Sequence, residues 1–365
     1  MIDFREGTVN EIVRRRKDLT EIKVKLEVDT CIAVNLDSLT GDIAIGDRVV
    51  LNTTAVELNL GTGGKHFVLW NFRHHVIKAS GAGHIMKLRY TPLQLKLLSV
   101  EEQKSPYHKV MQNTDLKGMP VIVGSIHSQL PAVAATIKNI DSSVKIAYVM
   151  TDGGALPIVF SDLVYKLKTL NLIDATITAG HAFGGDYEAI NVYSSLIAAK
   201  YVAKADIAVV IMGPGITGTD TPLGFSGIEQ GEIINAVHNL NGQSIAIPRI
   251  SFSDKRERHY GVSHHTLTCL SKVALASSVV TLPEMSADKM EIVNNQFRQC
   301  GVNSKHKIEI MANDETLSSL EKYDLKVTTM GRTSSEEPEF FKAAGCAGLY
   351  ALRLLKRSGE KIVGS

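Results

Sequence analysis

Polar and glycine-rich stretches follow several apolar, strand-length runs of this sequence, and their side chains could do acid–base chemistry. His127, Asp152 and His181 each come shortly after such a run, and Asp186 follows His181 across a Gly-Gly pair. Imidazole and carboxylate groups serve as general acids, general bases or metal ligands. We therefore take these four residues as the catalytic candidates. The alternative is that they are loop residues whose hydrogen bonds are purely structural.

A second set of residues has the chemistry needed to bind an anion. Residues 213–218 read Gly-Pro-Gly-Ile-Thr-Gly, and backbone N–H groups of such loops can cradle an anion. Arginines suited to bidentate phosphate or carboxylate binding follow further along, and a serine there is a predicted helix N-cap. A solvated charged turn is the alternative. The predicted anion-binding residues are Gly213, Gly215, Thr217, Gly218, Thr219, Arg249, Arg256, Arg258, His259, Ser263 and His264.

The glycine loop also satisfies the pattern G-x-G-x-x-G, but a dinucleotide site needs the following helix to open inside the motif. Pro222 and Gly224 delay that helix, so we expect it to begin near Phe225. Arg249 could accept the 2′-phosphate of NADP, which leaves an NADP-linked oxidoreductase as one hypothesis. A Walker-type loop is excluded because no Gly-Lys-Ser or Gly-Lys-Thr ending is present.

A divalent metal is compatible with the residue types, and the cofactor is otherwise undetermined. Asp152 and the histidines at 127, 181, 259 and 264 could bind zinc, manganese or iron. No H-E-x-x-H spacing supports one particular set. His264 and His265 are adjacent and should point about 100° apart on a helix, so we do not expect them to share a metal.

Beyond residue 118, apolar runs of strand length alternate with helical patterns. Predicted strands lie at 120–124, 145–150, 175–179, 207–212, 244–248, 279–282, 307–311 and 326–329. Predicted helices lie at 130–139, 156–170, 189–202, 225–239, 266–277, 287–299, 315–323 and 338–357. Strands that are apolar on both faces and separated by helices indicate a doubly wound α/β fold with a mainly parallel sheet. The ligand site of such a sheet lies at the carboxyl ends of its strands.

The first hundred residues follow a different pattern. Alternation with a period of two, as in residues 21–27, and closely spaced turns indicate a small all-β barrel or sandwich. The basic run Arg14–Lys17 is interpreted as a solvated hairpin tip. A polar segment at 101–117 marks the boundary, so we predict domains at 1–105 and 106–365.

Composition narrows the class of protein. The chain has 365 residues and a formal net charge of +2, which gives no drive toward nucleic acid or membrane. The longest apolar runs fall short of the roughly 20 residues that span a bilayer. Four widely spaced cysteines without a CxxC pair indicate reduced thiols. We expect a cytoplasmic protein whose partner is a small anionic molecule, and a homo-oligomer is compatible with the sequence.

The stretches 180–188, 213–227 and 249–265 resemble those of an uncharacterised bacterial family, known as a domain of unknown function. The resemblance extends over nearly the whole chain, from Gly7-Thr8-Val9 to the C-terminal helix. It implies a bacterial origin. Since the family has no assigned activity, it implies no role for any residue.

Three functions are therefore compatible with the sequence. The first is an enzyme, a hydrolase or transferase rather than an oxidoreductase, that acts on a phosphorylated or otherwise anionic metabolite. The second is a ligand-binding sensor or regulatory protein without catalysis. The third is the NADP-linked oxidoreductase. A single ligand site at the strand ends is common to all three.

Overall fold

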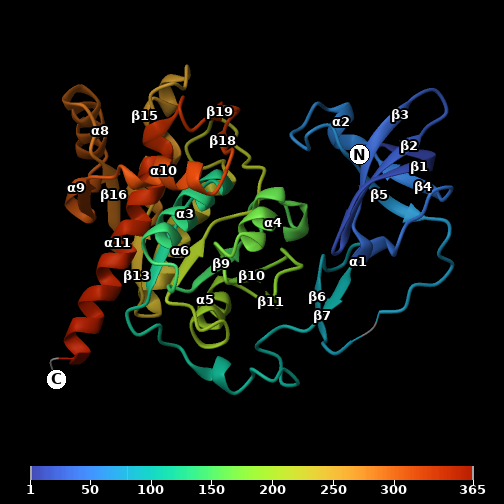
Figure 1. The fold of residues 1–365 in the computed structure, drawn as a ribbon, viewed down its shortest axis with the longest axis horizontal. Coiled ribbons are helices and arrows are strands. Elements are labelled where there is room, and N and C mark those ends of the chain that lie inside the picture. Colours follow the sequence, from blue (N-terminus) through green and yellow to red (C-terminus); the bar gives the residue numbers. More distant parts are fainter. Residues whose placement is uncertain (1, 80, 364–365) are drawn as a thin grey trace. The chain divides into compact units, whose positions relative to one another are not determined.

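The computed structural model describes residues 2–79 and 81–363. The chain forms two compact units, Met1–Leu97 and Leu98–Ser365 (Figure 1). The division falls a few residues before the predicted boundary. Each unit has a hydrophobic core built from its own residues. The predicted fold class is confirmed, since a small β-barrel precedes an α/β unit.

The first unit is a closed barrel of five strands. They are β1 (Phe4–Arg16), β2 (Leu19–Lys25), β3 (Thr30–Asn35), β4 (Arg48–Asn52) and β5 (His66–Asn71), in the order β1-β2-β3-β5-β4. β4 pairs back with β1 and closes the barrel. Short helices α1 (Asp37–Thr40) and α2 (Thr54–Glu57) lie in the connections, and β6 (Ile85–Lys87) pairs with β7 (Leu95–Leu97) as a separate hairpin. Alternate inward side chains, such as Ile22 and Val24, fill the barrel.

The basic run lies differently from the prediction. Arg14–Arg16 belong to β1, so the turn itself consists of Lys17 and Asp18. Arg14 forms an ion pair with Glu21 across the hairpin, with the Nη2 and Oε1 atoms 3.0 Å apart. The run is therefore not simply a solvated tip.

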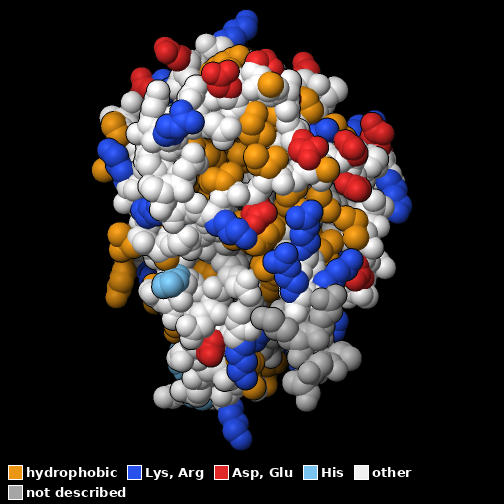
Figure 2. Space-filling model, turned by 90° about the vertical axis from the view of Figure 1, so that its left-hand side faces the viewer, with side chains coloured by type: hydrophobic (Ala, Val, Ile, Leu, Met, Phe, Trp, Pro, Cys, Tyr) orange, Lys and Arg blue, Asp and Glu red, His pale blue; other side chains and the backbone are white. Residues whose placement is uncertain are grey.

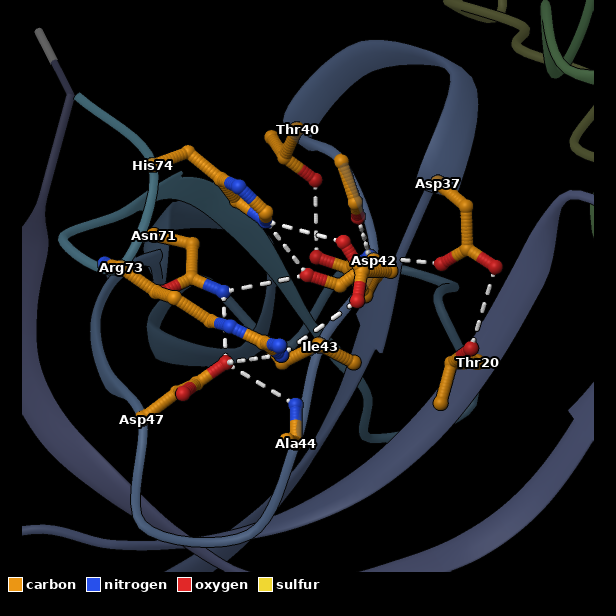
Figure 3. A network of polar contacts seen from close by, with 12 residues as sticks. Thr20, Asp37, Thr40, Asp42, Ile43, Ala44, Asp47, Asn71, Arg73 and His74 are labelled. Carbon is orange, nitrogen blue, oxygen red and sulfur yellow. Dashed lines mark hydrogen bonds and ion pairs between the residues drawn. The ribbon is translucent and has the colours of Figure 1, made fainter. Parts of the chain in front are cut away.

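A polar network holds the connection between β3 and β4 against the end of β5 (Figure 3). Asp47 accepts hydrogen bonds from the Ala44 amide and from Asn71 Nδ2, both at 2.9 Å. The His74 ring lies 2.7 Å from the carbonyl oxygen of Asp42. These groups satisfy one another's hydrogen-bonding capacity, so we assign the network a structural role.

The second unit is built around an eight-stranded sheet in which every pairing is parallel. Its strands, in order across the sheet, are β11 (Tyr187–Glu188), β10 (Ala175–Thr178), β9 (Ile146–Met150), β12 (Ile207–Val210), β8 (Pro120–Val123), β13 (Gln243–Ala246), β16 (Val279–Pro283) and β17 (Lys307–Met311). The central strands are buried on both faces, which explains their continuous apolar character.

Helices cover both faces of this sheet. One face carries α3 (Leu130–Ile140), α4 (Asp162–Thr169), α10 (Glu315–Lys322) and α11 (Pro338–Val363), the long red helix of Figure 1. The other carries α5 (Val192–Tyr201), α6 (Glu229–Asn239), α8 (Ala287–Gln299) and α9 (Val302–Lys305). Successive strand residues point to opposite faces, so Val121 and Ile122 belong to different cores.

Two predicted elements differ from the structure, and one strand was missed. The strand at 326–329 is wrong as a member of the main sheet, because β18 (Thr328–Thr329) pairs only with β19 (Arg332–Thr333), antiparallel. The two-residue edge strand β11 was not predicted, since it is too short to show a period. The helix at 266–277 begins earlier, as α7 (His264–Thr268), and continues as a π-helix, Cys269–Val273.

The side of the second unit that carries α8, α9 and α11 has charged and apolar side chains interspersed (Figure 2). At the sheet edge, Lys307 and Glu309 of β17 form an ion pair with Nζ and Oε1 2.6 Å apart. Charges on an edge strand discourage pairing with another strand. Among the residues the structure describes, no helix is both long enough and apolar enough to cross a bilayer.

Candidate functional site

The candidate site lies at the edge of the sheet where the strands end. Since all eight strands are parallel, their carboxyl ends share this edge. The chain runs from β8 outward to β9, β10 and β11, returns to β12, and then crosses to β13 on the other side of β8. Such a reversal leaves a crevice between the loops, where open α/β sheets bind ligands.

Six basic side chains gather beyond β13, and we call them the Arg/His cluster. They are Arg249, Arg256, Arg258, His259, His264 and His265. All but His264 line a cavity of about 180 Å³, together with Ile216, Gly218, Asp220 and Met330. Ligand pockets for whole metabolites are usually about 300–1,000 Å³. The cavity therefore has room for one anionic group of a ligand rather than for a dinucleotide.

A small hairpin positions the cluster. β14 (Ile250–Ser251) pairs with β15 (Gly261–Val262), and the loop between them carries three of the six cluster residues, Arg256, Arg258 and His259. The Ser263 amide donates to the Arg249 carbonyl at 2.8 Å, and the Arg249 amide donates to Thr266 Oγ1 at 3.0 Å. These bonds tie the start of α7 to the end of the β13 segment. The prediction that Ser263 caps a helix is confirmed, because its hydroxyl accepts from the His265 amide.

Asp254 is the buried counterion of the arginines. Its carboxylate accepts hydrogen bonds from Arg256 Nε at 2.9 Å and Nη2 at 2.7 Å, and it lies 3.4 Å from Arg332 Nη2. The hydrogen bonds of Arg256 are the main reason why the pKa of Asp254 lies far below its usual range. The Asp254 carboxylate therefore stays ionised and fixes the loop.

Arg249 is less well satisfied than Arg256. It is only 4% exposed, and its Nη2 atom has no hydrogen-bond partner among the described residues. Its nearest carboxylate oxygen, on Asp254, is 3.7 Å away. Burial, followed by the charges of Arg256 and Arg332, lowers the pKa of Arg249 to about 10 against the attraction of Asp254. At neutral pH Arg249 therefore presents an incompletely paired guanidinium to the cavity.

The three histidines of the cluster are packed against one another. The ring centroids of His264 and His265 are 4.2 Å apart, and those of His259 and His264 are 5.0 Å apart. Burial, and then the nearby positive charges, lower the pKa of both His259 and His265 to about 3. The pKa of His264 is lowered for the same reasons. All three imidazoles are therefore neutral at pH 7.

A second polar group lies beyond β9. Glu229, at the start of α6, accepts a hydrogen bond from Thr151 Oγ1. Burial raises the pKa of Glu229 to about 7, against the effect of that hydrogen bond, and the charge of Asp152 raises it further. A carboxyl group that titrates near pH 7 is suited to general acid–base catalysis.

Comparison with known proteins identifies the family of the chain. The family described as "Protein of unknown function (DUF3866)" matches residues 32–348. The chain belongs to this family. The match begins within β3 and ends within α11, so it spans both units. The family resemblance expected from the sequence is confirmed, and no curated protein matches the chain.

In this DUF3866 protein the glycine loop forms hydrogen bonds mainly with residues of the same loop. The Thr217 amide donates to Ser226 Oγ at 3.1 Å, and the Thr219 amide donates to the Gly224 carbonyl at 2.9 Å. Gly213 packs against Gly154, and Gly215 is exposed and does not line the cavity. Gly218 is the predicted loop residue that does line it. The following helix starts only at Ser226, with a 3-10 turn, so the geometry of a dinucleotide motif is not met.

His127 lies in the interior of the DUF3866 protein. Its Nε2 lies 2.8 Å from the hydroxyl of Ser161, which caps α4, and its Nδ1 lies 3.2 Å from the Met212 carbonyl oxygen. Burial lowers its pKa to about 4. His127 therefore connects β8, β12 and α4, and any catalytic role stays a prediction.

The other three catalytic candidates lie beyond β9 and β10. The His181 amide donates to Asp152 Oδ2 at 2.9 Å, so these two are neighbours. Asp186 accepts from the Thr176 amide at 2.8 Å and pairs with Lys168. β10 and β13 are four strand positions apart, which is about 19 Å at about 4.8 Å a strand. These candidates and the Arg/His cluster therefore do not line one small cavity.

Sequence reasoning missed four residues of the site, namely Glu229, Asp254, His265 and Arg332. His265 was set aside because adjacent helical residues point in different directions, yet both rings turn toward His259. Glu229 carries a weak signal, as an acidic residue in the first helical turn after a glycine-rich loop. Its burial, which gives it chemical interest, has no signature in the sequence.

Proposed function

We propose that this protein is an enzyme that binds a phosphorylated or otherwise anionic small metabolite through the Arg/His cluster. The main support for this proposal comes from Arg249, which lines the cavity. Its buried Nη2 atom lacks a hydrogen-bond partner among the described residues. A buried donor without a partner costs about 1–3 kcal/mol. An oxyanion in the cavity would satisfy it, and Arg256 and Arg258 would add charge-assisted hydrogen bonds.

The enzyme class is proposed from the acid–base groups at the same edge of the sheet. Glu229, with its pKa of about 7, is the best suited general acid or base. An anion-binding site and an acid–base group at one edge of the sheet are the usual components of a hydrolase or transferase site. His181 and Asp152, which lie together beyond β9 and β10, remain the further candidates.

A second candidate function is ligand binding without catalysis. His127 and Asp186 are engaged in hydrogen bonds that hold strands and helices together. Their structural bonding favours a sensor or regulatory protein over an enzyme that depends on them. The Arg/His cluster serves this function equally well, so anion binding is common to both proposals.

The cellular setting is part of the proposal. Cys31, Cys269, Cys300 and Cys346 are all free thiols, which fits a reducing compartment. We propose the cytoplasm of a bacterium, in line with the family resemblance. We also propose a homo-oligomer as the assembly.

Titration calorimetry with inorganic phosphate tests the anion site. We expect Arg258→Ala to weaken phosphate binding at least tenfold, about 1.4 kcal/mol, and Arg249→Met to weaken it more. Arg298→Ala is the matched control, because Arg298 is exposed on α8 and outside the cavity. Arg258 is 39% exposed and can be replaced with little risk to folding. No phosphate binding by the native protein, or equal binding by all three variants, would overturn the proposal.

A further inference from the structure

Three imidazoles of the Arg/His cluster converge on one point. One potential ligand atom from each of His259, His264 and His265 lies within 4.8 Å of the other two. Nitrogen ligands of one tetrahedral zinc ion lie about 3.3 Å apart, given Zn–N bonds of about 2.0–2.1 Å. Small rotations of the three side chains would close that difference.

Two of the ring nitrogens are buried without a hydrogen-bond partner among the described residues. They are His264 Nε2 and His265 Nδ1. His265 as a whole is 7% exposed, so water does not readily take the place of a partner. Buried polar atoms in native proteins are nearly always satisfied, and an orphan calls for a missing ligand or ion.

The third histidine is held as metal-bound histidines usually are. His259 Nδ1 lies 2.7 Å from Ser263 Oγ, and His259 Nε2 accepts a long hydrogen bond from Arg258 Nε at 3.4 Å. Nε2 is therefore the unprotonated nitrogen, and a metal ion would take the place of Arg258 there. A hydrogen bond on the other ring nitrogen fixes the orientation of a metal-bound imidazole. Phe225, which is itself 5% exposed, stacks on His265 with ring centroids 4.0 Å apart and covers one face of that imidazole.

We propose that His259, His264 and His265 bind a transition-metal ion, of which zinc is the natural candidate, and that the anion of the cavity completes its coordination. This rests on the proposed anion site. His259 and His265 line the cavity, so the open side of the metal faces the arginines. Three histidines with one open position form the arrangement of catalytic zinc sites.

Charge explains why metal and anion should bind together. Arg249, Arg256 and Arg258 surround the histidines, and a bare dication would be repelled by them. Asp254 offsets part of this charge, and Asp220 pairs with Arg258. An oxyanion bound by the arginines makes the electrostatic potential at the histidines favourable for a cation. Each ligand should therefore raise the affinity for the other by the same factor.

Titration of the chelator-treated full chain with Co²⁺ tests the proposal, because the visible absorption of Co²⁺ reports its coordination. We expect one equivalent to bind, at least tenfold more tightly with inorganic phosphate present, and the absorption to change when phosphate is added. His264→Ala and His265→Ala should each weaken Co²⁺ binding at least tenfold. His238→Ala is the matched control, since His238 is exposed on α6. Thermal unfolding verifies that each variant is folded.

The outcomes separate the two proposals. If Co²⁺ fails to bind while phosphate still binds, the metal site is overturned and the anion site stands. If neither binds, both proposals fail. Co²⁺ binding that is equal in the native protein and both histidine variants would overturn the assignment to these residues. Co²⁺ binding without any response to phosphate would overturn the shared coordination.

Discussion

At the scale of single residues, the second unit contains two carboxyl groups that differ in how fully they are hydrogen-bonded. Asp254 is buried with full hydrogen bonding, and its pKa is far below the usual range. Glu229 is partly buried with one hydroxyl donor, and its pKa rises to about 7. Environment rather than residue type therefore decides which carboxyl group exchanges protons near neutral pH.

The pH dependence of stability should reveal Glu229. In the native protein Glu229 binds its proton more tightly than the unfolded chain does, so the free energy of unfolding falls as pH rises from 4.5 through about 7. Glu229→Gln removes this dependence. We expect the variant to be more stable than the native protein by roughly 2–3 kcal/mol at pH 8 and by less than about 1 kcal/mol at pH 5. Urea unfolding at the two pH values measures this.

Glu291→Gln is the control for that experiment. Glu291 is exposed on another helix, α8, and does not contribute to the pKa of Glu229, so its replacement should leave the pH dependence nearly unchanged. A Glu229→Gln variant with the pH profile of the native protein would show that Glu229 is ionised throughout this range.

The sequence predicted which residues lie near the site but not which of their side chains are buried. Arg249, Arg256, Arg258 and His259 were predicted together because they follow one strand within a few residues, and the cavity brings them together. His127 follows a strand equally closely, yet its ring lies beneath the surface against Ser161. The direction of a side chain at a strand end depends on the packing of the helices, which no local pattern records.

At the scale of elements, the β14–β15 hairpin sets the position of the Arg/His cluster. Gly261 begins β15 with a φ of +70°, and a β-carbon there would lie 2.5 Å from Gln296 Oε1. That oxygen accepts a hydrogen bond from the Val262 amide at 2.7 Å, and Gln296 Nε2 donates to the Tyr260 carbonyl at 2.9 Å. The hairpin is thus bound to α8 through one side chain.

Gly261→Ala should damage both stability and anion binding. It adds backbone strain and displaces Gln296 from its two hydrogen bonds, which together cost about 2–4 kcal/mol. Gly331→Ala is the matched control, because Gly331 has a φ of +80° but no atom near the added carbon. It should lose only about 1 kcal/mol or slightly more. Equal losses of stability in denaturant unfolding would mean that the contact with Gln296 contributes nothing.

At the scale of the whole molecule, the chain has separate cores in its two units. Ile22 belongs to the core of the barrel, and Val209 belongs to a core of the sheet, both fully buried. Fold class was predictable because the alternation of period two gives way to alternating strands and helices. The order of the strands was not, since β12 inserts between two strands that precede it, and nothing in an apolar run specifies its neighbours.

The separate cores should give two unfolding transitions in calorimetry. Ile22→Ala removes about 2–5 kcal/mol from the barrel and should shift one transition, while Val209→Ala should shift the other. Each variant serves as the control for the other. A single transition that both substitutions shift equally would show that the two units unfold as one.

The insertion of β12 also has a consequence for biosynthesis. A nascent chain that has produced β8 and β9 holds two apolar strands that do not pair with each other in the finished protein. Both wait for β12, residues 207–210, before the middle of the sheet can close. The barrel, by contrast, is complete once residue 71 has emerged. Since domains generally fold as units, N-terminal first, the ribosome releases a folded barrel ahead of a segment that is still vulnerable to aggregation.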